Sequence, residues 1–244
     1  MRLIVRMVGS GRLSKWTLLY RLAKDSFSPQ FKGLAILWAF YLAVAPPPTY
    51  RVLQTIGSEC ESVLDIGCGR NSFTSNLGCS VSVGVEAWLP DILEAKGRGT
   101  HDHFVVARAE RLCFAPKSFD CVLALDVIEH LTRREGFSLI EEMETIARRK
   151  IVIFTPNGFV PQRKEGSPLQ FHKSGWTVKD FKAMGFKITG VRCPRAVWFR
   201  RNSVVDKSKI SSKLREIGSN IFHFLGTDPE MCFQLLCVKS PRDR

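Results

Sequence analysis

The stretch Val63-Leu64-Asp65-Ile66-Gly67-Cys68-Gly69-Arg70 decides the fold of this 244-residue chain. Its apolar half is typical of a buried strand, and its two glycines are typical of the turn that ends such a strand. Glycine lets the backbone pass close to a ligand, and a helix that starts after the turn presents free N–H groups. The stretch therefore predicts a loop that cradles a cofactor at the carboxyl end of a strand.

Strand-like and helix-like patterns alternate after this stretch. A segment that is apolar on both faces, residues 119–125, is typical of a central parallel strand. Thr177, with Asp180 three residues later, predicts the start of a further helix. We expect an α/β fold: a doubly wound, mostly parallel, seven-stranded Rossmann-like sheet with N-terminal helices and a C-terminal insertion or cap. The expected strands are residues 62–66, 80–85, 104–107, 119–125, 150–154, 186–192 and 231–238, and helices are expected at 72–77, 90–95 and 134–148.

Charge divides the chain into three parts. Residues 1–57 carry eight Lys or Arg and one acid, so they are basic. Residues 58–160 carry eleven Lys or Arg and fifteen acids, and residues 161–244 carry seventeen Lys or Arg and seven acids, so the middle is mildly acidic and both ends are basic. We expect a basic helical extension at 1–57 and one domain at 58–244. Within that domain, residues 158–176 and 193–229 would form a loop and an insertion on the substrate side. Basic ends favour an anionic neighbour such as a membrane, a nucleic acid or a phosphorylated substrate, although a merely solubilising surface is the alternative.

Residues 34–45 form an unbroken run of twelve apolar residues, followed by three prolines. A membrane-spanning helix needs about twenty such residues, so this run is too short to cross a bilayer. Its last three residues, Ala-Val-Ala, resemble a signal-peptidase site, but the basic leader before the run is far longer than that of a signal peptide. We expect either a buried helix or a helix in the membrane interface, which would give residues 1–45 a peripheral membrane contact.

The eight cysteines include no Cys-x-x-Cys pair, and most lie in apolar, strand-like runs. This pattern argues against a zinc site and against a disulfide framework. We therefore expect free thiols and a cytoplasmic protein.

Three features indicate which cofactor the glycine loop holds. Asp65 precedes the glycines on the strand, where a carboxylate can receive a cationic group. Glu86 ends the next strand, where a carboxylate can accept bonds from two ribose hydroxyls. Asn71 and Ser72 stand where a dinucleotide motif has its third glycine. Together these features favour a nucleoside with a cationic tail.

These motifs resemble those of the class I S-adenosylmethionine-dependent methyltransferases. Residues 63–70 are similar to the first motif of that family, and Glu86 matches its second-strand acid. Residues 107–114 resemble the third motif, and residues 118–131 are close to the fourth-strand motif of the small-molecule branch. The resemblance implies S-adenosylmethionine as cofactor and covers roughly residues 58–192 and the closing strand.

The resemblance implies roles around the first two strands. Asp65, Gly67 and Gly69 would hold the methionine end of the cofactor, with Cys68 between them. Glu86 would bind the ribose.

The resemblance also implies the contacts of the adenine ring. Ala87 would line its face, and Ala109 and Glu110 would meet its edge. Arg108 departs from the family, which often has an acid at this position that contacts the adenine amine. That contact is either lost or taken over by Glu110.

Asp126 and Val127 would line the sulfonium side, from which the methyl group is delivered. His130 follows closely and is the candidate general base for an acceptor that must lose a proton, with a helix-capping histidine as the alternative. Glu129 either orients His130 or faces solvent. A metal held by these two residues and a further acid is the less favoured alternative, because the sequence shows no tight ligand cluster. We therefore expect no metal site.

Candidates for contacting the acceptor lie after the fifth strand. Asn157 ends that strand and would face the crevice, and His172, Ser174 and Trp176 follow the long loop that would overhang it. The alternative is that Trp176 belongs to the core and His172 is an ordinary loop residue.

The expected function is methyl transfer to a small-molecule or lipid-like acceptor. One alternative is an RNA methyltransferase whose basic ends contact phosphates, but the chain lacks the Asn-Pro-Pro-Tyr type of motif that base-amine methylation usually shows. A non-catalytic cofactor-binding scaffold is the other alternative, against which the intact Asp65, Gly67, Gly69 and Glu86 argue.

Overall fold

The computed structural model describes residues 52, 55–56, 60–72, 74, 79–161, 168–192 and 228–241. Most of the expected N-terminal extension, including the apolar run at 34–45, lies outside the described residues. The same holds for most of the expected helix at 72–77 and of the insertion at 193–229. Within the described part, no helix combines the length and apolar character needed to cross a bilayer.

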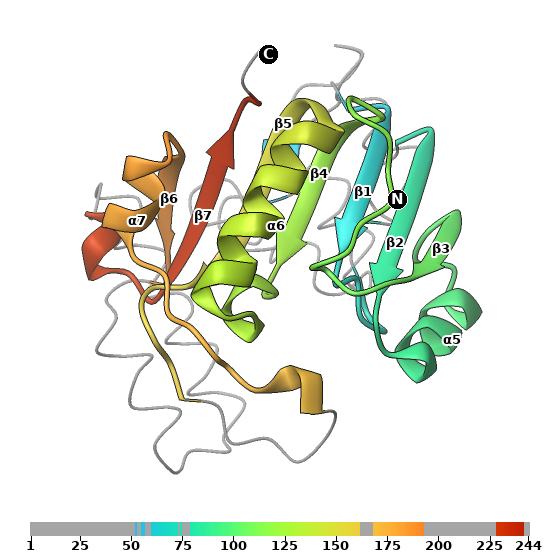
Figure 1. Cartoon of the computed structure of the whole chain (residues 1–244), viewed down its shortest axis with the longest axis horizontal. Helices are drawn as coiled ribbons and strands as arrows, with labels where there is room; N and C mark the ends of the chain where they lie inside the picture. The colour runs from blue at the N-terminus through green and yellow to red at the C-terminus, as the bar shows by residue number, and fades with distance from the viewer. Residues whose placement is uncertain are drawn as a thin grey trace, which may run out of the picture.

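Seven strands form one sheet, in the order β3-β2-β1-β4-β5-β7-β6 (Figure 1). β1 lies between β2 and β4, and it is parallel to both. The predicted α/β fold with a mostly parallel Rossmann-like sheet is therefore confirmed. The strands are β1 (Ser62–Ile66), β2 (Val81–Glu86), β3 (His103–Val106), β4 (Phe119–Leu125), β5 (Ala147–Pro156), β6 (Lys187–Val191) and β7 (Gln234–Lys239).

The last strand runs against the other six. β7 pairs antiparallel with both β5 and β6, so it lies one strand in from the edge of the sheet. A strand that is reached after a long excursion of the chain can pair in this antiparallel direction. In Figure 1 the arrowheads of β1, β2 and β4 point toward one edge of the sheet, and that of β7 points away from it.

Among the described residues from 60 onward, three α-helices accompany the sheet: α5 (Leu89–Gly97), α6 (Arg133–Ile146) and α7 (Val178–Ala183). The side chain of Thr132 caps α6 by accepting from the backbone N–H of Glu135, and Thr177 caps α7 through Asp180 in the same way. The predicted start of α7 is therefore confirmed. Three short 3₁₀-helices complete the described elements: η3 (Ile128–His130), η4 (Pro168–Gln170) and η6 (Pro229–Met231).

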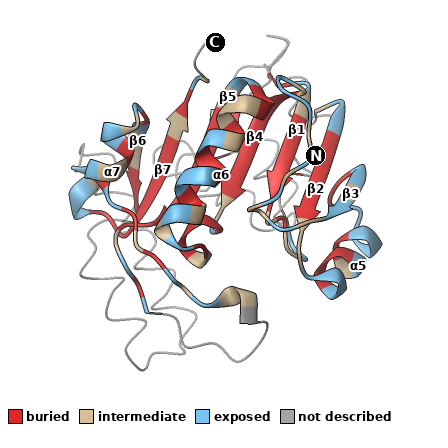
Figure 2. Cartoon of the chain, in the orientation of Figure 1, coloured by how far each residue is buried: buried red, intermediate tan, exposed pale blue. Residues whose placement is uncertain are grey.

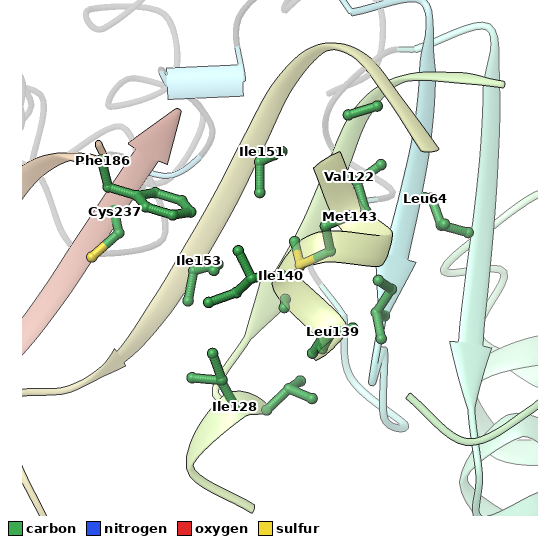
Figure 3. Close-up of a cluster of buried hydrophobic side chains, with 14 of the residues drawn as sticks. Leu64, Val122, Ile128, Leu139, Ile140, Met143, Ile151, Ile153, Phe186 and Cys237 are labelled. Atoms are coloured by element: carbon green, nitrogen blue, oxygen red, sulfur yellow. The ribbon is translucent and has the colours of Figure 1, made fainter. Parts of the chain in front are cut away.

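The largest core cluster lies between α6 and the sheet. Leu139, Ile140 and Met143 project from α6 onto β4 and β5, where they meet Val122 and Ile153 (Figure 3). The central strands are buried along most of their length, whereas the outer face of α6 is exposed (Figure 2). Burying each such aliphatic side chain contributes about 1.5–3 kcal/mol, so this packing holds the central strands in place.

Asp120 joins the beginning of β1 to the beginning of β4. Its Oδ2 accepts from the backbone N–H groups of Glu61 at 3.0 Å and Ser62 at 3.1 Å, and its Oδ1 accepts from Arg148 at 3.0 Å. Burial would raise the pKa of the Asp120 carboxyl, but the hydrogen bonds from Ser62 and Arg148 outweigh it, and the pKa is lowered. The charged carboxylate therefore stabilises the native state.

One expectation about the cysteines needs correction. Cys60, Cys68, Cys79, Cys113, Cys121 and Cys237 are free thiols, as expected, whereas Cys232 is disulfide-bonded.

We predict that Asp120→Asn lowers the free energy of unfolding by about 1–3 kcal/mol, because the amide keeps only one acceptor oxygen for these donors. Because the folded-state pKa is lowered, the stabilisation is present above the unfolded-state pKa of about 3.9 and fades as the pH falls through it. Urea unfolding at pH 7 and at pH 3.5 measures both effects.

The matched control is Glu141→Gln, which removes one exposed carboxylate from α6. This control should change the free energy of unfolding by less than about 0.5 kcal/mol. Equal effects of the two substitutions at pH 7 would contradict the role of Asp120.

Candidate active site

A cavity of about 190 Å³ opens where β1, β2 and β4 end. This edge of a doubly wound sheet is where such folds bind ligands. Nine residues named from the sequence line the cavity: Gly67, Gly69, Glu86, Ala87, Ala109, Glu110, Asp126, Val127 and His130. Arg108, which the sequence analysis placed at the adenine contact, lines it as well. The sequence analysis named no role for the other lining residues, which are Trp88, Asp91, Ala107, Leu131, Leu169, Gln170 and Lys173.

Gly67 is the point of closest approach in the cavity wall. Its φ is +67°, and a Cβ at this position would lie 2.4 Å from Cγ2 of Val127. Any larger residue would have to displace Val127 and adopt a backbone conformation that side chains disfavour. The first glycine of the loop is therefore required by both its backbone conformation and its packing.

The backbone of the glycine loop and of the turn after β2 holds the Glu86 carboxylate in place. Oε2 accepts from the N–H of Gly69 at 3.2 Å, and Oε1 accepts from those of Ala87 at 2.8 Å and Trp88 at 3.0 Å. A carboxylate has about four acceptor positions, so one remains for a ligand hydroxyl. Trp88 could have been suspected from the sequence, since an aromatic side chain so close to this acid can supply an apolar face for a ring.

Asp65 is not among the residues that line the cavity. Its Oδ2 accepts from the hydroxyl of Ser72 at 2.6 Å and lies 3.2 Å from Nε2 of the fully buried His101. The same histidine nitrogen lies 2.6 Å from the hydroxyl of Thr74. The Asp65 carboxylate therefore has hydrogen-bond partners inside the fold, and its role as the receiver of a cationic group stays a prediction.

Cys68 does not line the cavity either. The residue is buried, and its Sγ lies 2.8 Å from where a Cβ on Gly84 would stand. Desolvation, followed by the nearby charges of Asp65 and Glu86, raises the pKa of the Cys68 thiol.

Arg108 and Glu110 form an ion pair at the cavity wall. The Arg108 guanidinium donates to the Glu110 carboxylate at 2.8 Å. The acid at position 110 lines the cavity beside Arg108, and its charge is partly neutralised by the arginine.

Asp126 lies directly after β4 with a φ of +54°, an uncommon conformation for a residue other than glycine. Its backbone N–H donates to the carbonyl of Phe154 on the neighbouring strand at 2.8 Å. This hydrogen bond holds the strained residue at the cavity wall. Strained residues of this kind are concentrated at functional sites.

Glu129 and His130 end the short helix η3 beneath the cavity. Glu129 is only 3% exposed, so it does not face solvent as one alternative held, and its Oε2 accepts from the hydroxyl of Thr155 at 3.0 Å. Burial, followed by the charge of Asp126, raises the pKa of this carboxyl to about 8. The His130 ring lies 4.8 Å from that of His172, and burial lowers the pKa of both imidazoles.

The structure gives two of the expected acceptor-contacting residues a structural role instead. The side-chain amide of Asn157 donates to the backbone carbonyls of Pro229, Glu230 and Cys232, at 3.0–3.3 Å. Trp176 is fully buried in the core cluster, so it cannot reach an acceptor.

The backbone of residues 172–176 is fastened to η3. Lys173 and Ser174 donate their N–H groups to the carbonyl of Glu129 at 2.8 and 3.1 Å. The indole N–H of Trp176 donates to the carbonyl of Ile128 at 3.2 Å. His172 is thereby held beside His130, and Lys173 lines the cavity.

Residues 64–152 match the sequence model of a methyltransferase domain. Among solved structures, the fold is similar to one in a Haloferax volcanii complex between the Trm112 methyltransferase activator and a methyltransferase (TM-score 0.54, 12% identity, 88% of this chain and 96% of that one). It is also similar to a protein of Bacillus halodurans C-125 assigned as a methyltransferase (TM-score 0.52, 14% identity, 80% of this chain and 99% of that one). A third similar structure is that of a SAM-dependent methyltransferase from Archaeoglobus fulgidus (TM-score 0.50, 20% identity, 82% of this chain and 97% of that one). No curated protein sequence matches the chain.

The matched residues include the glycine loop, Glu86 and the end of β4. The strand order of the sheet is consistent with a methyltransferase domain. The chain contains a methyltransferase domain and has the fold of known methyltransferases. It is a methyltransferase whose cofactor is S-adenosylmethionine, as the sequence predicted.

We predict that Gly67→Ala weakens binding of S-adenosylhomocysteine at least tenfold, because the added methyl group collides with Val127 at the cavity wall. Isothermal titration calorimetry measures the affinity. The matched control is Gly97→Ala at the end of α5, where a Cβ would meet no atom within 4 Å. If the Gly67 variant binds like the control, the loop does not hold the cofactor.

Proposed function

We propose that this methyltransferase acts on a small-molecule or lipid-like acceptor. The observation that carries the proposal is the charge of the cavity wall. Its lining residues include more acids than bases: the acids are Glu86, Asp91, Glu110 and Asp126, and the bases are Arg108 and Lys173. A site for a nucleic acid would instead present a basic groove to the phosphates, so the described part of the cavity favours an acceptor without a phosphate backbone.

The residues at the cavity wall suit the parts of the cofactor. Glu86 would bind the ribose through its remaining acceptor position, and Ala87 and Trp88 would lie against the adenine. The acidic Asp126 would face the cationic sulfonium end, with Gly67 and Gly69 close to the methionine tail. S-adenosylmethionine supplies an already activated methyl group, so this chain needs to bind, orient and shield the two reactants.

Residues at the start of the segment fastened to η3, and just before it, would shield the reaction from water. Leu169, Gln170 and Lys173 line the same cavity as the glycine loop, although they come from the other half of the chain. The hydrogen bonds of Lys173 and Ser174 to the Glu129 carbonyl hold this wall in place. Excluding water strengthens the electrostatic interactions inside the cavity and protects the activated methyl group from hydrolysis.

His130 would assist the acceptor in losing its proton. The imidazole lines the cavity close to Asp126 and Val127, and burial lowers its pKa, so the ring is neutral at pH 7. A neutral imidazole can take a proton from a hydroxyl or hold a cation that acidifies it.

The acceptor class is tested with full-length protein and S-adenosylmethionine that carries a tritiated methyl group. Small metabolites, extracted lipids and total RNA are offered in separate reactions. We expect the label in the metabolite or lipid fraction. Incorporation into RNA alone would overturn the proposed acceptor class while leaving methyl transfer intact.

For an acceptor found in this way, we predict that His130→Gln lowers kcat by about 10²–10⁴-fold, the usual contribution of proton transfer. The affinity for S-adenosylhomocysteine should change less than threefold. His103→Gln, at an exposed histidine that begins β3, is the matched control and should keep full activity. If the His130→Gln enzyme keeps its kcat, His130 does not take part in proton transfer and has a structural role.

A further inference from the structure

Three potential metal ligands meet beside the cavity. One ligand atom each from Glu129, His130 and His172 lies within 4.8 Å of the other two. The sequence showed no tight cluster because His172 is remote from the other two residues along the chain. Fastening of residues 172–176 to η3 brings it alongside them.

His172 is oriented as a metal ligand would be. Its Nδ1 lies 2.6 Å from the carbonyl oxygen of Val160, which can only accept, so this nitrogen carries the proton. In the neutral ring, Nε2 therefore holds a free lone pair. Histidine ligands commonly donate their second nitrogen to a backbone carbonyl in this way, and the bond fixes both tautomer and ring direction.

His130 contributes an unsatisfied nitrogen. Its Nδ1 is buried and has no hydrogen-bond partner in the described structure. A buried polar atom without a partner is costly, so native proteins seldom retain one without a use for it. The edge-to-face contact with His172, at 75° between the ring planes, keeps the two imidazoles side by side.

Glu129 brings a carboxylate to the same place. Thr155 donates its hydroxyl to Oε2 at 3.0 Å, and within the described ranges no Lys or Arg forms an ion pair with this acid. One carboxyl group and two imidazoles, all of kinds that bind transition metals, therefore lie together at this place.

We propose that Glu129, His130 and His172 form a binding site for a divalent transition-metal ion at the acceptor end of the cavity. Two imidazoles and one carboxylate suit Zn²⁺, Mn²⁺, Fe²⁺ or Co²⁺ better than Mg²⁺, which prefers oxygen ligands. Three donors about 2.1 Å from one tetrahedral or octahedral ion lie about 3.0–3.4 Å apart, and the present separations are at most 4.8 Å, so the side chains need to close by at most about 1.8 Å.

Such an ion would act on the acceptor. Three protein ligands leave coordination positions open, and His130 itself lines the cavity. The open positions would take oxygen atoms of the acceptor, and a bound hydroxyl would lose its proton to water more readily. This role rests on the proposed function, whereas metal binding itself does not.

The test measures metal binding directly, on full-length protein prepared without a histidine tag and freed of metal with a chelator. Co²⁺ is titrated and followed by its visible absorption, and bound Zn²⁺ and Mn²⁺ are counted by mass spectrometry after dialysis. We expect one ion per chain. His172→Gln and Glu129→Gln should each weaken binding at least thirtyfold, whereas the control His103→Gln should bind as the wild type does.

No bound ion, or binding that the His172 and Glu129 substitutions leave unchanged, would overturn the metal site. His172→Gln keeps the test decisive if Glu129→Gln fails to fold, because His172 is only half buried. Calorimetry with S-adenosylhomocysteine on the same samples shows that the protein is folded, and the tritium assay separates the two proposals. Cofactor binding without metal binding would refute only the metal site, whereas metal binding with transfer of the labelled methyl group to RNA alone would refute only the proposed function.

Discussion

The contact between the backbone of Gly67 and the side chain of Val127 is the constraint on which the site depends. β1 and β4 are adjacent parallel strands, so the turns that follow them leave the sheet side by side. A residue with a Cβ at position 67 would collide with Val127, whereas glycine lets the two turns touch. The walls of the cavity are built outward from this contact.

A second set of contacts joins the two halves of the chain. The carbonyls of Ile128 and Glu129 accept hydrogen bonds from Trp176, Lys173 and Ser174. These bonds bring one wall of the cavity and the second imidazole to the end of β4. The acceptor end of the site is therefore an assembled feature, and it depends on a buried tryptophan that does not itself touch the cavity.

Local patterns explain why the cofactor end could be predicted from the sequence. A strand followed by glycines, and an acid at the end of the next strand, identify Gly67, Gly69 and Glu86 within one short stretch of chain. The direction of the Asp65 side chain could not be predicted in this way, because its partner His101 comes from a later segment of the chain.

The acceptor end was harder to predict because it is formed by contacts between distant segments. No local pattern relates His172 to His130, and Asn157 and Trp176 are polar or aromatic residues whose hydrogen bonds are satisfied inside the fold. The division of the chain at residue 57 remains a prediction, since most of the extension lies outside the described residues.

A crystal structure of the full chain with S-adenosylhomocysteine tests the central claim most directly. We predict a ribose hydroxyl within hydrogen-bond distance of the Glu86 carboxylate and the sulfur beside Asp126 and Val127. A nucleoside bound elsewhere, or turned so that its ribose lies away from Glu86, would contradict the assignment of this cavity as the methyl-donor site.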